Sequence, residues 1–230
     1  LNILIGATTY KIIQDHAASS STRKMNNGLL YEIYNSAIFM PDSGDIKIYH
    51  KTKLVPGVEK MPFPKLLDPL VKFATDLGGI AGSLGKDNSK NYFLTNNFIL
   101  RPLICYESVY GDLGAGKSSL ISIITNDGWW KNTAGYKQHF SYASLRAIEQ
   151  RRWIVRSANT GISGVINEKG VVVQKSEWDQ SISLSSQVSV MDINTFYSIY
   201  GYYIGRISVF ISLLLILISF TSKSFGTDTN

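Results

Sequence analysis

Apolar residues gather in short runs along the chain, and segments rich in glycine, proline and polar residues separate these runs. Runs of this length between turn residues are typical of strands. In the first part of the chain they predict strands over residues 1–7, 31–40 and 46–50. The last two form a predicted hairpin, because residues 41–45 contain the proline and glycine that favour the backbone angles of a turn.

Two segments of this first part lack the strand pattern. Residues 14–27 are polar and rich in serine, so they predict a loop. Residues 51–64 carry three prolines, which a regular helix does not tolerate in its interior. We therefore expect an ordered loop there.

The second part of the chain alternates between the strand and the helix pattern. Apolar residues near 3.6-residue spacing, Phe140, Ala143 and Ala147 among them, predict a helix over residues 135–152. A proline at position 102 falls inside one predicted strand, where it cannot donate a ladder hydrogen bond. The predicted strands cover residues 97–105, 120–125, 153–157 and 188–193, with a further hairpin over 164–174.

Strands that interleave with fewer helices indicate a layered α/β domain. The chain has 230 residues, which suits one large domain and a short appendage. We place the domain at residues 1–195.

The C-terminal region has a different pattern. Residues 207–222, between Arg206 and Lys223, contain no charge and are mostly Ile, Leu, Val and Phe. As a helix this stretch is about 24 Å long, against a hydrocarbon core of roughly 30 Å. A buried amphipathic helix is the alternative, but its outer face would carry charges. The pattern therefore favours a membrane helix.

Aromatic residues support the same interpretation. Tyr200, Tyr202 and Tyr203 precede the apolar stretch, and tyrosine favours the membrane–water interface. We expect a transmembrane helix over residues 202–222 and a short tail over 223–230.

Composition and charge narrow the class of protein. Hydrophobic residues make up 44% and charged residues 17% of the chain, which supports a sizeable core and excludes general disorder. The 23 Lys and Arg against 17 Asp and Glu give a net charge of +6, which favours anionic partners such as phospholipid headgroups or nucleic acid. The basic residues are scattered, which favours the membrane surface.

Cys105 is the one cysteine of the chain, so no intrachain disulfide can form. It ends a predicted apolar strand and precedes Tyr106 and Glu107. A thiol in this position can be exposed on a sharp turn, with the next backbone N–H directed at the oxyanion formed on an attacked carbonyl. The alternative is an inert buried cysteine, which is common in proteins.

Lys51 begins the proline-rich loop directly after a predicted strand. A lysine close to a cysteine favours the thiolate and can stabilise an oxyanion. Glu59 and Glu107 could orient this lysine or exchange protons. Each of the three is equally consistent with a solvated surface residue, and none is specific alone.

Residues 111–118 fit the nucleotide-binding P-loop pattern G-x-x-x-x-G-K-S. A P-loop needs a strand directly before it and a helix after it, whose N-terminus holds the phosphate. Here the preceding predicted strand ends near Cys105, and a strand rather than a helix is predicted to follow. We therefore expect a chance match, with nucleotide binding as the alternative function.

A series of motifs occurs in one order along the chain and is more specific than any single residue. It comprises Y-N-S-A at 34–37, Y-H-K-T-K-L-V-P-G-V-E-K-M-P-F at 49–63, I-C-Y-E at 104–107, N-D-G-W-W at 126–130, Q-H at 138–139, R-A-I-E at 146–149 and R-S-A-N-T-G-I-S-G at 156–164. The series resembles the nitrilase, or carbon–nitrogen hydrolase, superfamily, and within it the apolipoprotein N-acyltransferases.

The resemblance implies a four-layer α-β-β-α sandwich and a Glu–Lys–Cys triad. The triad glutamate belongs to an upstream motif that is not found here, so we expect it, the N-terminal part of the sandwich and further membrane helices before Leu1, and this segment alone to be inactive. By resemblance the site residues are Cys105 as nucleophile, Lys51 as the triad lysine, Glu59 as an additional loop glutamate, Glu107 after the nucleophile, and Tyr106 and Trp129 near the acyl and lipid site.

The resemblance also implies a reaction. An acyl chain passes from a phospholipid, with phosphatidylethanolamine expected, through a thioester on Cys105 to the N-terminal amine of a diacylglyceryl-cysteine in an apolipoprotein. We expect no cofactor, no metal and no nucleic-acid partner. The expected location is the bacterial inner membrane, in a multi-pass protein with its catalytic domain on the periplasmic side. A nitrilase-type amidohydrolase of a small amide and a catalytically inactive membrane-anchored module are the alternatives.

Overall fold

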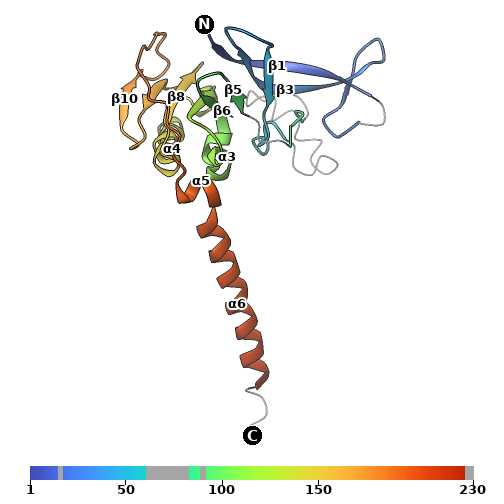
Figure 1. Ribbon diagram of the computed structural model, residues 1–230. Helices are drawn as coiled ribbons and strands as arrows, with labels where there is room; N and C mark the ends of the chain where they lie inside the picture. The colour runs from blue at the N-terminus through green and yellow to red at the C-terminus, as the bar shows by residue number, and fades with distance from the viewer. Residues whose placement is uncertain (15–17, 61–82, 89–91, 226–230) are drawn as a thin grey trace.

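Two β-sheets and a helical layer form the body of the protein, and one long helix projects from it (Figure 1). The computed structural model describes residues 1–14, 18–60, 83–88 and 92–225. The end of the predicted proline-rich loop, residues 61–64, and most of the predicted tail lie outside these ranges.

The first sheet is antiparallel and is centred on β3 (Leu30–Met40). β1 (Ile3–Ile13) pairs with β3 over its 11 residues, which carries it beyond the predicted end at residue 7. β4 (Lys47–His50) pairs on the other side of β3 and confirms the predicted hairpin. β2 (Arg23–Lys24), a two-residue strand inside the predicted loop at 14–27, also pairs with β3.

The second sheet has the strand order β10-β9-β8-β7-β6-β5. Its three central strands are parallel and the outer strands are antiparallel to their neighbours. The strands are β5 (Phe93–Leu94), β6 (Ile99–Ile104), β7 (Leu120–Thr125), β8 (Trp153–Ala158), β9 (Gly164–Ile166) and β10 (Val172–Lys175). The predicted strands at 97–105, 120–125 and 153–157 and the hairpin at 164–174 are therefore confirmed.

Pro102 lies inside β6 without disrupting it. β5 pairs only with Ile99 and Leu100, whereas β7 pairs with β6 as far as Ile104. Among the described residues, β6 has no strand neighbour on the β5 side beyond Leu100. Proline is tolerated at such an edge because no ladder donor is needed there.

The predicted strand at 188–193 is wrong, because this segment has no ladder partner in the described part of the chain. Its residues make separate contacts instead. Val188 packs against the core between the sheets, and the backbone N–H of Met191 donates to the carbonyl of Ser119. Val190 is largely exposed. The short apolar run docks on the domain without joining a sheet.

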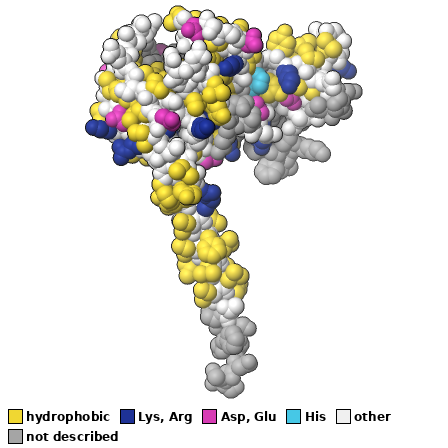
Figure 2. All heavy atoms as spheres, in the orientation of Figure 1, with side chains coloured by type: hydrophobic (Ala, Val, Ile, Leu, Met, Phe, Trp, Pro, Cys, Tyr) yellow, Lys and Arg dark blue, Asp and Glu magenta, His cyan; other side chains and the backbone are white. Residues whose placement is uncertain are grey.

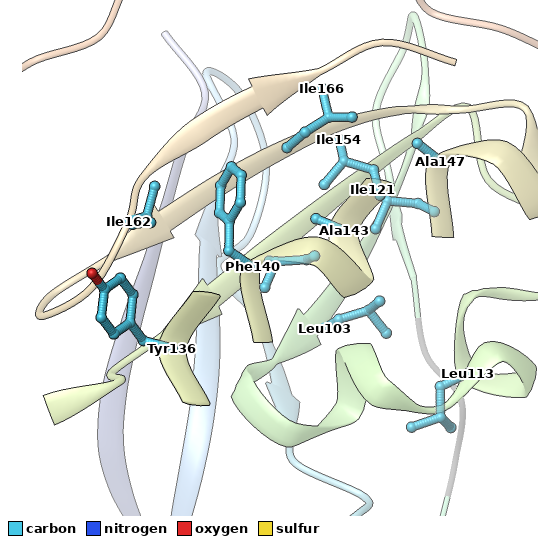
Figure 3. Packing of buried hydrophobic residues seen from close by; sticks show 11 residues of the cluster. Leu103, Leu113, Ile121, Tyr136, Phe140, Ala143, Ala147, Ile154, Ile162 and Ile166 are labelled. Carbon is cyan, nitrogen blue, oxygen red and sulfur yellow. The ribbon is translucent and has the colours of Figure 1, made fainter. Parts of the chain in front are cut away.

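The two faces of the second sheet bury different partners. On β7, Ile121 and Ile123 belong to a cluster that packs under α4 (Ala134–Gln150), as Figure 3 shows. Leu120 belongs to a cluster between the two sheets. This alternation follows from the two-residue period of a strand. The inter-sheet cluster contains Ala37, Phe39, Tyr49, Phe93, Leu100, Ile104 and Leu120.

A glycine allows the two sheets to approach closely near this cluster. A Cβ atom built on Gly6 of β1 would lie 2.6 Å from the Ile124 side chain of β7. The described residues thus form two sheets and one helical layer, which are three of the four layers of the expected sandwich. The outer face of the first sheet carries exposed Ile3, Ile5 and Ile48 in this part of the chain.

α4 forms close to its predicted range. The Thr133 hydroxyl caps its N-terminus by accepting from the Gly135 N–H, and Arg151 ends it in the left-handed conformation with φ 51°. Its buried face includes the apolar residues whose spacing predicted it, Phe140, Ala143 and Ala147.

The projecting helix is α6 (Tyr203–Phe225), which follows the short α5 (Phe196–Tyr200). Residues 203–221 are long and apolar enough to cross a membrane, and none of that window is buried. Figure 2 shows an apolar surface along this helix below the domain. Thr195 caps α5 with its hydroxyl oxygen, and the same hydroxyl donates to the carbonyl of Glu149 at the end of α4.

We expect Ile154→Ala to lower the free energy of unfolding by about 2–5 kcal/mol, because it removes a fully buried side chain from the cluster under α4. Chemical denaturation in detergent measures this loss. Ile148→Ala, at a position on α4 that is 46% exposed, is the matched control and should cost about 1 kcal/mol or less. Equal losses in the two variants would contradict the assignment of the core.

Candidate functional site

A cavity of about 900 Å³ opens where β6 and β7 end, with β1 and β3 of the first sheet opposite. Cys105, the residue after β6, lines this cavity and is half-buried, so the thiol is not sealed in the core. The other lining residues are Gly6, Ala7, Thr8, Asn35, Ser36, Val58, Glu59, Leu84, Ile104, Ile124, Thr125, Asn126, Gly128, Trp129, Lys131, Asn159 and Thr160.

Cys105 has an unusual backbone conformation. Its φ is 51°, in the left-handed region that non-glycine residues rarely adopt. The residue stands at the junction of β6 and the 3-10 helix η3 (Cys105–Val109), so the chain turns sharply there. Two side chains contact its carbonyl oxygen: the Ser108 hydroxyl donates at 2.8 Å, and His139 Nε2 lies at 3.1 Å. Strained backbone of this kind is retained where surrounding contacts hold it.

Lys51 forms a buried ion pair with Glu59. Its Nζ lies 2.8 Å from each carboxylate oxygen of Glu59, and the lysine is fully buried. The Asn35 amide donates to the same carboxylate at 2.6 Å and the Val55 N–H at 2.7 Å. Glu59 itself lines the cavity, so the pair adjoins the space that Cys105 faces.

Glu107 is fully buried and joins the cysteine turn to the lysine loop. One carboxylate oxygen accepts from the backbone N–H of Ile104, directly before Cys105, at 2.8 Å. The other accepts from the Thr52 N–H and hydroxyl at 2.7 Å each, directly after Lys51. It also accepts from the Tyr49 hydroxyl at 2.7 Å and from the Lys53 N–H at 3.3 Å.

The Glu107 charge acts on its neighbour Tyr49 as well. Burial, and then the negative charge of Glu107, raise the pKa of Tyr49 well above its ordinary value. Tyr49 therefore stays a hydrogen-bond donor to the carboxylate across the physiological range.

The two predicted substrate-binding residues lie in different surroundings. Trp129, in the 3-10 helix η4 (Gly128–Trp130), lines the cavity and is 38% exposed. Tyr106 packs edge-to-face on Tyr110, with ring centroids 5.2 Å apart, and does not line the cavity. The cavity wall thus contains Cys105, Glu59 and Trp129. Lys51 adjoins the cavity through its ion pair with Glu59, whereas Tyr106 and Glu107 do not line it.

Three polar residues that belong to the ordered motifs, but to which the sequence analysis assigned no role, meet behind Cys105. Asp127 accepts from His139 Nδ1 at 2.7 Å and from Arg156 Nη2 at 2.6 Å, and all three are buried. They come from the end of β7, from α4 and from β8, so no sequence spacing connects them. The available signals were their places in the motifs at 126–130, 138–139 and 156–164, and the position of His139 on the apolar face of α4 beside Phe140.

Electrostatics in this group favour a charged aspartate. Burial opposes ionisation of Asp127, but the hydrogen bond from His139 and the charge of Arg156 outweigh it, and the pKa of Asp127 lies below its ordinary value. Burial lowers the pKa of Arg156, and the Asp127 charge opposes that change.

Cys105, Asp127 and His139 are also the group that could hold a metal ion. One ligand atom of each lies within 4.8 Å of the others. Both ring nitrogens of His139 already face hydrogen-bond partners, and Asp127 is engaged by Arg156 and by the Thr125 hydroxyl. The donor set therefore fits a hydrogen-bond network better than a metal centre.

The segment with the P-loop pattern lacks the geometry of a phosphate site. Residues 111–114 form a single helical turn, α3 (Gly111–Gly114), and the chain continues into strand β7 at Leu120. Ser118, the last residue of the pattern, is buried. No helix N-terminus follows the pattern, as the sequence predicted.

Comparison with known proteins supports one family. A family model described as carbon-nitrogen hydrolase matches residues 7–194. A protein of Rhodopseudomonas palustris named apolipoprotein N-acyltransferase is 32% identical over 191 residues, which is 80% of this chain and 35% of that protein. One of Rhizobium meliloti with the same name is 37% identical over 152 residues, 64% of this chain and 28% of that protein.

The chain spans about a third of the length of the curated relatives it matches. Among solved structures, a nitrilase-superfamily protein of Saccharomyces cerevisiae matches with a TM-score of 0.48 and 16% identity, over 65% of this chain and 51% of that one.

We expect Glu107→Gln to destabilise the fold by about 2–4 kcal/mol, since an amide nitrogen replaces one oxygen that accepts buried hydrogen bonds and the charge is lost. Thermal unfolding in detergent measures the change. Tyr49→Phe, which removes one donor and keeps the carboxylate, is the control and should cost about 1 kcal/mol. A Glu107→Gln variant as stable as the control would refute the tethering role.

Acid unfolding should depend on Asp127. Because its folded pKa lies below the ordinary value of 3.8, its stabilising contribution is complete above that value and is lost as the pH falls through the folded pKa. We expect Asp127→Asn to lose about 3–5 kcal/mol at neutral pH and to have a flatter stability profile below pH about 4. Unfolding temperatures from pH 6 to 2 test this, with the exposed Asp45→Asn as control; parallel profiles would contradict it.

Proposed function

The chain belongs to the carbon–nitrogen hydrolase family, and on that premise we propose that it catalyses acyl transfer in lipoprotein maturation, with Cys105 as the acyl carrier. The donor is a phospholipid, with phosphatidylethanolamine expected, and the acceptor is the N-terminal amine of a diacylglyceryl-cysteine. The relatives named apolipoprotein N-acyltransferase support this choice of reaction. The observation that carries it is a cysteine on a strained turn, facing a cavity whose wall includes the Lys51–Glu59 ion pair.

In the first half-reaction the Cys105 thiolate attacks the ester carbonyl of the phospholipid. A carbon–sulfur bond forms and the ester carbon–oxygen bond breaks. Lysophospholipid leaves and takes up the proton that the thiol gave up. A thioester keeps enough reactivity to acylate an amine, so one difficult step becomes two easier ones.

We assign two donors to the oxyanion that forms in each half-reaction. The backbone N–H of Tyr106 follows Cys105 at the turn, where η3 begins. Lys51 supplies an ammonium group fixed by Glu59. Fixed donors aimed at developing charge are usually the largest contribution to acyl-transfer catalysis.

In the second half-reaction the acceptor amine attacks the thioester. An amide forms, the carbon–sulfur bond breaks, and the proton of the amine restores the thiol over the whole cycle. Glu59 is the one carboxylate among the described lining residues, and we assign it the transfer of this proton. Trp129, half-exposed at the cavity wall, gives the acyl chain an apolar surface.

Both substrates are lipids, and the domain continues into a helix suited to the bilayer. α6 has 23 residues, which corresponds to about 35 Å of helix. Its apolar side chains are exposed over residues 203–221. We propose that α6 spans the bacterial inner membrane and holds the catalytic domain against its periplasmic surface, within a multi-pass protein.

Incubation of membranes carrying the full-length protein, whose upstream part is expected to supply the triad glutamate, with phosphatidylethanolamine should yield an acyl adduct on Cys105 that intact-mass measurement detects and hydroxylamine removes. Cys105→Ala should give no adduct, and Lys51→Met should form it about 100-fold more slowly, since a fixed oxyanion donor is lost. Lys60→Met, which removes an exposed lysine of the same loop, is the control and should react normally.

The same assay separates the proposal from a nitrilase-type amidohydrolase. A hydrolase would release product to water in the absence of lipid and would leave the lipoprotein amine free. Full acylation of the acceptor by Cys105→Ala would refute the thioester mechanism.

A further inference from the structure

The buried group behind Cys105 has an arrangement that the proposed reaction has not yet used. His139, on α4, faces Asp127 through Nδ1 at 2.7 Å and the Cys105 carbonyl through Nε2 at 3.1 Å. The histidine and the aspartate are buried. The Asp127 side chain and the backbone carbonyl of Cys105 therefore fix the histidine directly behind the nucleophile.

The hydrogen-bond partners of the His139 imidazole restrict its protonation state. Both Asp127 Oδ1 and the Cys105 carbonyl are acceptors, so the ring satisfies both only when each nitrogen carries a hydrogen. The Ser108 hydroxyl lies 3.1 Å from Nε2 and 2.8 Å from the same carbonyl, but it has one hydrogen to donate. With a neutral ring, that hydrogen is shared between Nε2 and the carbonyl. With a protonated ring, Ser108 and His139 both donate to the carbonyl.

We propose that His139 is a positioning residue for Cys105: as an imidazolium held by Asp127, it fixes the carbonyl of the left-handed cysteine turn and stabilises the thiolate. The proposal rests on the proposed function only in taking Cys105 as the nucleophile. Ligand atoms of Cys105, Asp127 and His139 lie within 4.8 Å of one another, so the imidazolium charge acts on the sulfur at short range.

With His139 protonated and Cys105 a thiolate, the buried group of Cys105, Asp127, His139 and Arg156 has no net charge. Arg156 and Asp127 form a buried ion pair at 2.6 Å, and imidazolium and thiolate form a second pair beside it. Arg156 also lies 3.3 Å from His139 Nδ1 and opposes protonation of the ring, whereas Asp127 lies between the two cations and favours it. A neutral ring beside a thiolate would leave the buried group with a net negative charge, which is costly.

Other ionisable groups face Cys105 from different elements. The Lys51–Glu59 pair adjoins the cavity, and the carboxylate of Glu107 is satisfied by five hydrogen bonds from neighbouring groups. The Lys51–Glu59 pair has no net charge, and Glu107 does not line the cavity. Lys131 also lines the cavity, whereas a ring nitrogen of His139 lies within 4.8 Å of the sulfur, so His139 can place an adjustable positive charge at short range.

Cys105 is the one cysteine of the chain, so its alkylation by iodoacetamide reports directly on the thiolate. Rates measured from pH 5 to 10 on the protein in its membrane should fall about tenfold at pH 7 in His139→Gln, with the whole profile displaced to higher pH. Ser108→Ala, which removes the uncharged donor to the same carbonyl, should leave the position of the profile unchanged. His50→Gln, at the half-buried histidine of β4, is the matched control and should also leave it unchanged.

A reciprocal measurement keeps the test valid if His139→Gln fails to fold. In protein labelled with 13C-histidine and carrying His16→Gln and His50→Gln, His139 is the remaining histidine, and its titration can be followed by NMR. In Cys105→Ser, which lacks the thiolate, the His139 titration should move to lower pH. An unchanged titration here, or an unchanged alkylation profile in folded His139→Gln, would overturn the proposal.

These outcomes are independent of acyl transfer. If no thioester forms but the alkylation profile moves in His139→Gln, the proposed reaction fails and the coupling of His139 to Cys105 holds. If the thioester forms and neither profile moves, His139 has a purely structural role.

Discussion

The site depends on one buried carboxylate. Glu107 accepts five hydrogen bonds, and their donors come from both the cysteine turn and the lysine loop. A buried carboxylate without its donors is costly, and so is each buried N–H without its acceptor. Neither segment can therefore leave its place without an unsatisfied group in the other. The cysteine turn and the Lys51 loop form as one unit although they lie far apart in the sequence.

A second anion-centred network supports the same turn from another side. Asp127 collects donors from His139, Arg156 and Thr125, and His139 continues the network to the Cys105 carbonyl. Together the two networks account for the left-handed backbone of Cys105. Such a conformation costs of order 1–3 kcal/mol and persists only where its surroundings determine it. Hydrogen-bond donors hold the backbone of Cys105, and its side chain also packs against the cluster between the two sheets.

The sequence predicted the parts of the fold that depend on local patterns. Strand β7 occupies the predicted residues, because a short apolar run bounded by polar residues is typical of a buried strand in a layered domain. Pairing between strands follows from contacts that no local pattern contains. β1 extends to Ile13 because β3 offers a partner along its whole length, whereas the run at 188–193 has no ladder partner in the described part of the chain and docks through Val188 and Met191 instead.

The same distinction holds for the site. Cys105, Lys51 and Glu59 could be named because ordered motifs carry them, and Trp129 for the same reason. Glu107 could exchange protons in a reaction, or it could hold two segments of the chain together. Its hydrogen bonds with Tyr49 and Thr52 indicate the second role, and only the folded chain brings these residues to it. His139 was part of the Q-H motif but received no role for a related reason, because a histidine on an apolar helix face becomes informative only when its partners Asp127 and Arg156 are known.

α4 connects the site to the membrane-directed end of the chain. His139, in the first half of α4, contacts the Cys105 carbonyl. At the end of α4, the Glu149 carbonyl accepts a hydrogen bond from Thr195, the residue that caps α5 ahead of α6. The ten residues from His139 to Glu149 correspond to about 15 Å of regular helix. Because a packed 17-residue helix is rigid, it fixes the position of the cysteine turn relative to the start of α6. The proposed reaction between lipid substrates would require such a fixed relation, since the depth of the ester in the bilayer would determine where the sulfur must lie.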